Sequence, residues 1–138
     1  MGDKGGQQSI RVEFVGDEHQ PVVIVEDFAA HPEQLIAEAE TLNFEVMGEY
    51  YPGVRARVPQ TYLDALAPLV ARVLREFFGH RGPLDSRALY SLVTTPSGQL
   101  TLPQRIPHVD GLQEGSFAIL HYLSRGNYGG TAFYRHRS

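Results

Sequence analysis

The sequence predicts an α+β fold in which two helices pack on the outside of a curved antiparallel sheet. Runs of β-branched and aromatic residues are typical of strands near the N-terminus and again in the second half of the chain, and two segments between them carry apolar residues at helical spacing. With 138 residues, 42% of them hydrophobic and 20% charged, the chain has room for one core. We therefore expect a single domain over residues 1–138.

The first elements expected along the chain are a tail and two strands. Residues 1–9 are polar and contain glycine, which indicates a flexible tail. Ile10 to Val15 and Pro21 to Glu26 are β-branched runs, and the turn-rich residues 16–20 lie between them. This arrangement favours a hairpin.

Two helices are expected next, separated by a loop. The first begins at Pro32, and its apolar residues at helical spacing are Leu35, Ile36, Ala39 and Leu42. Residues 44–58 contain the turn signal Pro52-Gly53 and are interpreted as a long connecting loop.

The second helix has the strongest helical pattern in the chain. It follows Pro59 and ends at Gly79, a residue type favoured just past a helix C-terminus. Its broad apolar face comprises Leu63, Leu66, Leu69, Val70, Val73, Leu74, Phe77 and Phe78. Pro68 lies inside this helix and is expected to kink or divide it, because proline lacks an N–H group and clashes one turn back.

Three further strands are expected in the second half of the chain: Ala88 to Thr94, Phe117 to Leu123 and Thr131 to Arg135. Residues 10–95 then hold the strands and helices of the N-terminal half. Residues 96–138 form a β-rich part that carries a histidine–aspartate motif.

The composition excludes several classes of function. The net charge of -4 comes without a run of lysine or arginine, so a nucleic-acid partner is not expected. No apolar run approaches the roughly 20 residues that span a bilayer, and neither membrane association nor secretion is signalled, so we expect a cytoplasmic protein. Because the chain has no cysteine, any metal must be bound by nitrogen and oxygen ligands.

The segment Pro107-His108-Val109-Asp110-Gly111 carries the most specific chemical signal. A histidine and an aspartate two apart on an extended segment point to the same side, and mononuclear non-haem iron sites use two histidines and one carboxylate on one face. His31-Pro32-Glu33 has the same spacing but opens a predicted helix, where proline and an acid belong for backbone reasons. The residues C-terminal to each motif must therefore distinguish the two.

Three ordered pieces of sequence make this distinction. His108-Val109-Asp110 is succeeded by the apolar run Ala118 to Leu123 and then by Gly129-Gly130-Thr131-Ala132-Phe133. In this order the C-terminal part resembles the Fe(II)/2-oxoglutarate-dependent dioxygenase superfamily, in its prolyl-4-hydroxylase-like branch. The resemblance implies a partial double-stranded β-helix, a jelly-roll or cupin-like antiparallel core with the two helices packed on it. It also implies hydroxylation coupled to decarboxylation of 2-oxoglutarate at Fe(II).

The resemblance assigns the metal ligands only in part. It makes His108 and Asp110 the first two ligands, and Gly129-Gly130 the turn into the next strand. The family's distal histidine, and the basic residue that pairs with 2-oxoglutarate, come later than Ser138. We therefore expect a truncated piece of a longer enzyme, with elements from a partner chain or a remnant without catalysis as alternatives. His136 is a weaker candidate for the third ligand, because two arginines flank it.

Other polar residues are candidates for cosubstrate and substrate binding. Arg105 and Arg125 lie near the motif and can pair with a carboxylate through a bidentate fork. Tyr90 and Tyr122 can hydrogen-bond the cosubstrate, although aromatic residues in strands are usually core residues. Arg55 and Arg57 adjoin the Tyr-Tyr-Pro-Gly turn and are candidates for a substrate entrance. For His121, a hydrogen-bonded core position is expected.

Two rival functions remain open from the sequence. One is a catalytically silent jelly-roll interaction or assembly domain, and the other is a cupin-type metal hydrolase or isomerase. The substrate of an oxygenase is expected to be an amino-acid side chain, a peptide or a small metabolite. With two protein ligands we expect weak iron binding and little turnover. A homo-oligomer that covers the incomplete sheet is a further expectation.

Overall fold

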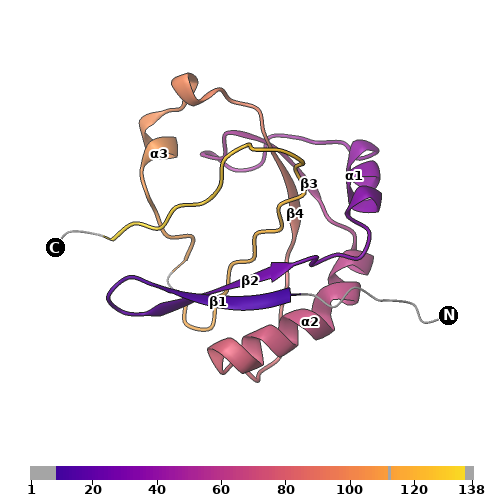
Figure 1. Ribbon diagram of the computed structural model, residues 1–138. Helices are drawn as coiled ribbons and strands as arrows, with labels where there is room; N and C mark the ends of the chain where they lie inside the picture. The colour runs from indigo at the N-terminus through magenta and orange to yellow at the C-terminus, as the bar shows by residue number, and fades with distance from the viewer. Residues whose placement is uncertain (1–8, 112, 136–138) are drawn as a thin grey trace.

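The computed structural model describes residues 9–111 and 113–135, and it contains two separate two-stranded antiparallel sheets (Figure 1). One sheet pairs β1 with β2 and the other pairs β3 with β4. The elements, in chain order, are β1 (Ser9–Val15), β2 (Gln20–Glu26), α1 (Pro32–Glu40), β3 (Gly53–Arg57), α2 (Gln60–Phe78), β4 (Leu89–Val93), the 3-10 turn η1 (Ser97–Gln99) and α3 (Leu102–Arg105).

The β1–β2 hairpin forms as expected from its β-branched runs. The register pairs Ser9 with Glu26 and Val15 with Gln20, so both strands are paired along their whole length. The turn places Gly16 and His19 at positive φ, which closes the hairpin within four residues. Ser9, expected in the flexible tail, belongs to β1, and the rest of that expected tail lies outside the described residues.

Both expected helices are present, and the longer one is continuous. Pro68 does not divide it, because α2 runs unbroken from Gln60 to Phe78. A proline removes only the N–H that would bond four residues back, and the bonds on either side hold the helix. At its end Gly79 takes the left-handed conformation with φ 67°, and the His80 N–H donates to the Leu74 carbonyl at 3.0 Å.

The prediction of an uninterrupted loop over residues 44–58 was wrong. Gly53–Arg57 forms β3, which pairs antiparallel with β4 from Gly53 opposite Val93 to Arg57 opposite Leu89. Glycine is required at position 53, since a Cβ there would lie 2.0 Å from the Leu92 carbonyl oxygen. The Pro-Gly signal therefore marks the start of β3, at a point where the β3 backbone approaches the β4 backbone closely.

The expected jelly-roll core is absent from the described residues, and that fold prediction is corrected to a small α+β fold of two short sheets and three helices. The segments 117–123 and 131–135, predicted as strands, carry no strand pairing here. A β-branched or aromatic sequence becomes a strand only where a neighbour supplies its hydrogen bonds. Residues 96–105 form η1 and α3 instead, and a capping box of Thr101 with Gln104 starts α3.

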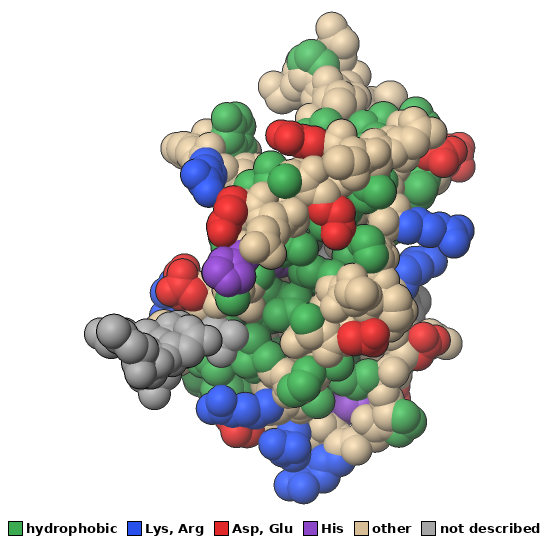
Figure 2. Space-filling model, turned by 90° about the vertical axis from the view of Figure 1, so that its right-hand side faces the viewer, with side chains coloured by type: hydrophobic (Ala, Val, Ile, Leu, Met, Phe, Trp, Pro, Cys, Tyr) green, Lys and Arg blue, Asp and Glu red, His purple; other side chains and the backbone are tan. Residues whose placement is uncertain are grey.

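The core is thin, and α2 packs against β2. Among the described residues, the buried hydrophobic side chains are Ala56 of β3, Leu74 of α2 and Tyr90 of β4. Figure 2 shows hydrophobic side chains gathered in the hollowed centre of one face, with charged side chains around the margin. Within the described part of the chain, no helix is long and apolar enough to cross a bilayer.

Candidate functional site

A cleft of about 2130 Å³ lies within the described part of the chain. It is lined by residues of α1, α2 and β4 and, on its other side, by the segment 113–131, which follows α3 in the chain. In Figure 1 this segment is the orange-to-yellow trace that runs beside β4. The volume of the cleft exceeds the roughly 300–1,000 Å³ of typical small-molecule sites, so the cleft can hold more than one small molecule.

Two hydrogen bonds between distant elements lie at the cleft. The Tyr90 hydroxyl donates to Glu38 Oε1 at 3.0 Å, and Tyr62 Oη shares a hydrogen bond of 2.8 Å with His121 Nδ1. Burial, and then the Glu38 carboxylate, raise the pKa of Tyr90 to about 12. Burial also raises the pKa of Tyr62. Both phenols are therefore protonated at physiological pH, and Tyr90 uses its proton in the bond to Glu38.

His121 is one of the residues that connect the 113–131 segment to the rest of the fold. Its ring lies 5.0 Å from the Phe28 ring, edge to face, and 6.0 Å from the Tyr62 ring in a stacked arrangement. Burial lowers its pKa from the usual 6.5, because the charged form loses hydration. His121 is hydrogen-bonded as expected, but it is half-buried and not a core residue.

The His121 environment makes stability depend on pH. A histidine whose pKa is lower in the folded state favours folding above about pH 6.5, and this stabilisation is lost as the pH falls from 6.5 through the lower folded value. We expect the free energy of unfolding in urea to be lower at pH 5 than at pH 7.5. In the His121→Gln variant this difference should shrink, because glutamine does not ionise at this position. An unchanged pH difference in His121→Gln would contradict this assignment.

Two of the residues predicted to bind a cosubstrate line the same cleft as Tyr90. They are Tyr122 and Arg125, both on the 113–131 segment. The Tyr122 hydroxyl lies 2.5 Å from Thr131 Oγ1, so it joins the two arms of the loop that contains Arg125. Three of the four residues predicted for cosubstrate binding therefore line one cleft.

The His108–Asp110 pair has the geometry of two ligands to one metal ion. His108 Nε2 lies 3.3 Å from Asp110 Oδ1, and both side chains are exposed. With bonds of about 2.1 Å to nitrogen and oxygen, two ligands at right angles lie about 3.0 Å apart. The other ring nitrogen, His108 Nδ1, lies 3.2 Å from the Ile106 carbonyl oxygen. A backbone carbonyl in that position is the usual outer partner of a metal-binding histidine.

This contact determines where the proton sits on His108. The Ile106 carbonyl only accepts hydrogen bonds, so Nδ1 carries the proton. Nε2 then presents either a lone pair or a second proton to Asp110.

The matched motif His31-Pro32-Glu33 lacks this arrangement. Its donor atoms are also 3.3 Å apart, but the atom facing the carboxylate is Nδ1. Among the described residues no hydrogen bond holds the other ring nitrogen of His31. The two motifs therefore have the same residue spacing and the same distance between donor and carboxylate atoms. They differ in the contact between the His108 ring and the Ile106 carbonyl.

The remaining predicted site residues lie elsewhere. Arg105 ends α3, and Arg57 ends β3, and neither lines the cleft. Arg55 also lies outside the cleft lining, and its guanidinium stacks 3.7 Å above the Tyr51 ring. His136 lies outside the described residues. Over residues 9–111 and 113–135, no group of three histidine, aspartate or glutamate side chains is close enough to hold a metal.

Sequence reasoning missed the roles of Glu38, Tyr62 and Phe28 at the cleft. Glu38 and Tyr62 lie on helices, 52 and 59 residues from their hydrogen-bond partners. The signal available in advance was weak, since a tyrosine or a glutamate on an amphipathic helix usually faces solvent or fills the core.

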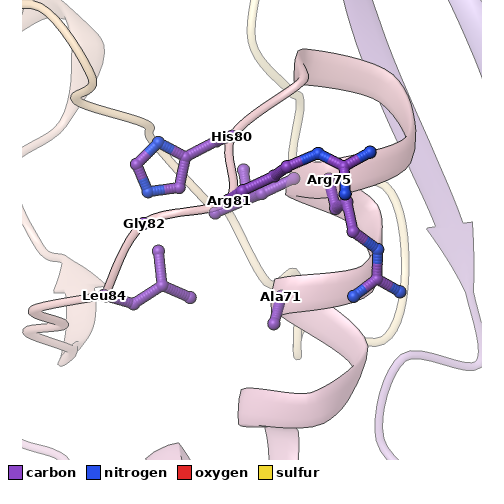
Figure 3. A pocket seen from close by; sticks show the side chains of 7 residues that line it. Ala71, Arg75, His80, Arg81, Gly82 and Leu84 are labelled. Carbon is purple, nitrogen blue, oxygen red and sulfur yellow. The ribbon is translucent and has the colours of Figure 1, made fainter.

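A smaller pocket of about 250 Å³ lies at the C-terminal end of α2 (Figure 3). Two arginines and a histidine line it together with apolar residues, and no acidic side chain does. Its volume is below that of typical ligand sites, and the C-terminus of a helix disfavours anions. We assign no function to it.

The comparisons with known proteins give the family. A family model described as a family of unknown function (DUF6445) matches residues 6–138. The chain belongs to the DUF6445 family. No curated protein and no solved structure matched the chain. The match to the DUF6445 family covers both the cleft and the His108–Asp110 pair, so both features lie within the family's own domain.

Proposed function

We propose that the chain is a Fe(II)/2-oxoglutarate-dependent oxygenase domain of the hydroxylase type. The observation that carries the proposal is the His108–Asp110 pair, with Nε2 and Oδ1 3.3 Å apart and Nδ1 held by the Ile106 carbonyl. A nitrogen and a carboxylate oxygen are two of the three ligands of the mononuclear iron site. The cytoplasmic location expected from the sequence belongs to the same proposal.

The fit of the pair to a divalent metal supports the assignment. Both side chains are exposed, with 72% and 83% of their surfaces accessible, so a hydrated ion reaches them without a structural change. The backbone contact orients the imidazole and keeps Nε2 toward Asp110. His108 and Asp110 would hold the ion and leave its other positions open.

The cleft supplies groups suited to 2-oxoglutarate. His108 and Asp110 do not themselves line this cleft, so Arg125 would serve a cosubstrate that extends from the metal into it, because a guanidinium binds a carboxylate through two parallel hydrogen bonds. Tyr90 and Tyr122 line the same cleft; the Tyr122 hydroxyl would donate to the cosubstrate, whereas the Tyr90 proton is bonded to Glu38 and leaves only an acceptor. Iron, when bound with 2-oxoglutarate, supplies oxidative decarboxylation of the cosubstrate coupled to hydroxylation of the substrate.

The substrate in this proposal is an amino-acid side chain, a peptide or a small metabolite. A cleft of about 2130 Å³ accommodates any of these beside the cosubstrate. With two ligands from the described residues, we expect weak iron binding and slow turnover.

Anaerobic titration calorimetry with Fe(II) tests the proposal. We expect weak 1:1 binding that tightens when 2-oxoglutarate is present, because the cosubstrate fills two further positions on the metal. Metal binding that does not respond to 2-oxoglutarate would favour a metal hydrolase or isomerase instead. The absence of any metal binding would favour an interaction domain without catalysis.

A further inference from the structure

The outer edge of β4 carries backbone groups without partners. Arg55 of β3 exchanges two backbone hydrogen bonds with Glu45, so its polar groups point away from β4 and leave the opposite residue Ser91 unbonded. In an antiparallel pair such positions alternate, so the N–H and C=O groups of Leu89, Ser91 and Val93 point away from β3. Among the described residues, none of these groups has a backbone partner. All three residues line the cleft, so the free edge borders the space where the proposed function places its ligands.

The segment 117–123, which runs beside β4 on the other side of the cleft (Figure 1), also has unpaired backbone groups. It forms no strand, and no backbone hydrogen bond joins it to another described residue. Its Ile119 and Leu120 are more than half exposed, as are Leu92 and Val93 of β4. A ligand in the cleft therefore meets main-chain donors and acceptors on both sides, with apolar side chains next to them.

The charged side chains of the cleft favour a cationic ligand. Acidic residues outnumber arginines in the lining, which holds Glu40, Asp64, Asp85 and Glu114 against Arg87 and Arg125. None of the four carboxylates forms a salt bridge within the described part of the chain. In the proposed function Arg125 pairs with 2-oxoglutarate, which leaves the lining still more acidic for a substrate. Complementary charge selects a partner and repels one of the same sign, so basic side chains on the substrate are favoured.

We propose that the substrate is an extended peptide with basic side chains, which adds to the free edge of β4 as a further strand. As a substrate assignment this rests on the proposed oxygenase function, whereas the binding site itself depends only on β4 and the cleft. A peptide carries N–H and C=O groups at the spacing of a strand, so its main chain can bond to the outward groups of Leu89, Ser91 and Val93. A small metabolite has no such series of groups and would leave the edge unpaired.

Fluorescence anisotropy with a labelled heptapeptide of alternating valine and lysine tests this site, in the absence of iron and 2-oxoglutarate. We expect saturable binding to the wild-type chain, and binding at least about tenfold weaker when glutamate replaces each lysine. Two N-methylated forms of the lysine peptide, one methylated at the lysines and one at the valines, keep the side chains but lose alternate N–H groups. At least one of them is expected to bind about tenfold more weakly, because it cannot donate to β4.

Proline at position 91 removes the protein's own donor at the centre of the edge. Since the Ser91 N–H points away from β3, Ser91→Pro leaves the β3–β4 hydrogen bonds in place. We expect it to bind the lysine peptide about tenfold more weakly, with an unchanged far-UV circular dichroism spectrum. Ser91→Ala keeps the N–H and is expected to bind as the wild type does. The N-methylated peptides keep the proposal testable if Ser91→Pro fails to fold.

Four results would overturn the proposal. They are no binding of the lysine peptide at millimolar concentration, equal binding of the glutamate peptide, unchanged binding of both N-methylated forms, and a folded Ser91→Pro that binds as tightly as the wild type. A wild-type dimer that Ser91→Pro converts to a monomer would place a second copy on this edge and overturn it as well. Because iron is absent, peptide binding and the Fe(II) titration can each fail without the other.

Discussion

Replacing Asp110 with alanine is expected to lower the affinity for Fe(II) by at least about 100-fold. Loss of an outer partner of a metal ligand costs about 10- to 100-fold in affinity, and loss of the ligand itself costs at least as much. His108→Ala should have the same effect, because either change leaves one protein ligand from the pair. Anaerobic titration with Fe(II) measures both affinities.

The matched control for this prediction is Glu33→Ala. His31 and Glu33 have the same spacing and the same 3.3 Å separation as His108 and Asp110, but the backbone contact of the ring is absent among the described residues. We expect Fe(II) affinity to be unchanged in Glu33→Ala. Equal losses in Asp110→Ala and Glu33→Ala would mean that the metal binds nonspecifically to exposed His-x-acid pairs.

Truncation of Leu74 is expected to destabilise the fold more than any surface change. Leu74 is 5% exposed and is one of three buried hydrophobic residues among those described. Removing a buried leucine side chain costs about 2–5 kcal/mol, from lost transfer energy and the cavity left behind. With so thin a core, a loss of this size is a large part of the total stability.

Urea unfolding of Leu74→Ala at pH 7.5 measures this cost. Leu102→Ala serves as its control, since Leu102 is 63% exposed and the same truncation there should change the free energy of unfolding by less than about 0.5 kcal/mol. Similar values for the two variants would show that Leu74 is not in a packed core.

The local elements could be predicted from sequence wherever neighbours in the chain determine them. The β1–β2 hairpin and the end of α2 at Gly79 depend on residues within a few positions of one another. β3 was missed because its pairing with β4 joins residues 32 to 40 positions apart, and the Pro-Gly turn before it suggested a loop. The run 117–123 was predicted as a strand on its own composition, yet strands form through partners that composition does not specify.

The candidate site, like the fold, could be predicted from sequence only where its residues are neighbours in the chain. His108 and Asp110 lie two residues apart, so an extended backbone suffices to bring them together. The Glu38–Tyr90 and Tyr62–His121 hydrogen bonds depend on how α1 and α2 face the cleft, which no local pattern encodes. Arg55 was predicted at a substrate entrance from its neighbouring tyrosines, and it stacks on one of them, Tyr51, outside the cleft lining.

The absorption spectrum of the chain with Fe(II) and 2-oxoglutarate, recorded without oxygen, tests the proposed function most directly. Chelation of iron by 2-oxoglutarate at the His108–Asp110 pair should produce a visible charge-transfer band that neither component gives alone. We expect this band in the wild-type chain and in Glu33→Ala, and its loss in Asp110→Ala. A wild-type spectrum without the band at saturating Fe(II) and 2-oxoglutarate, or a band that persists in Asp110→Ala, would contradict the assignment.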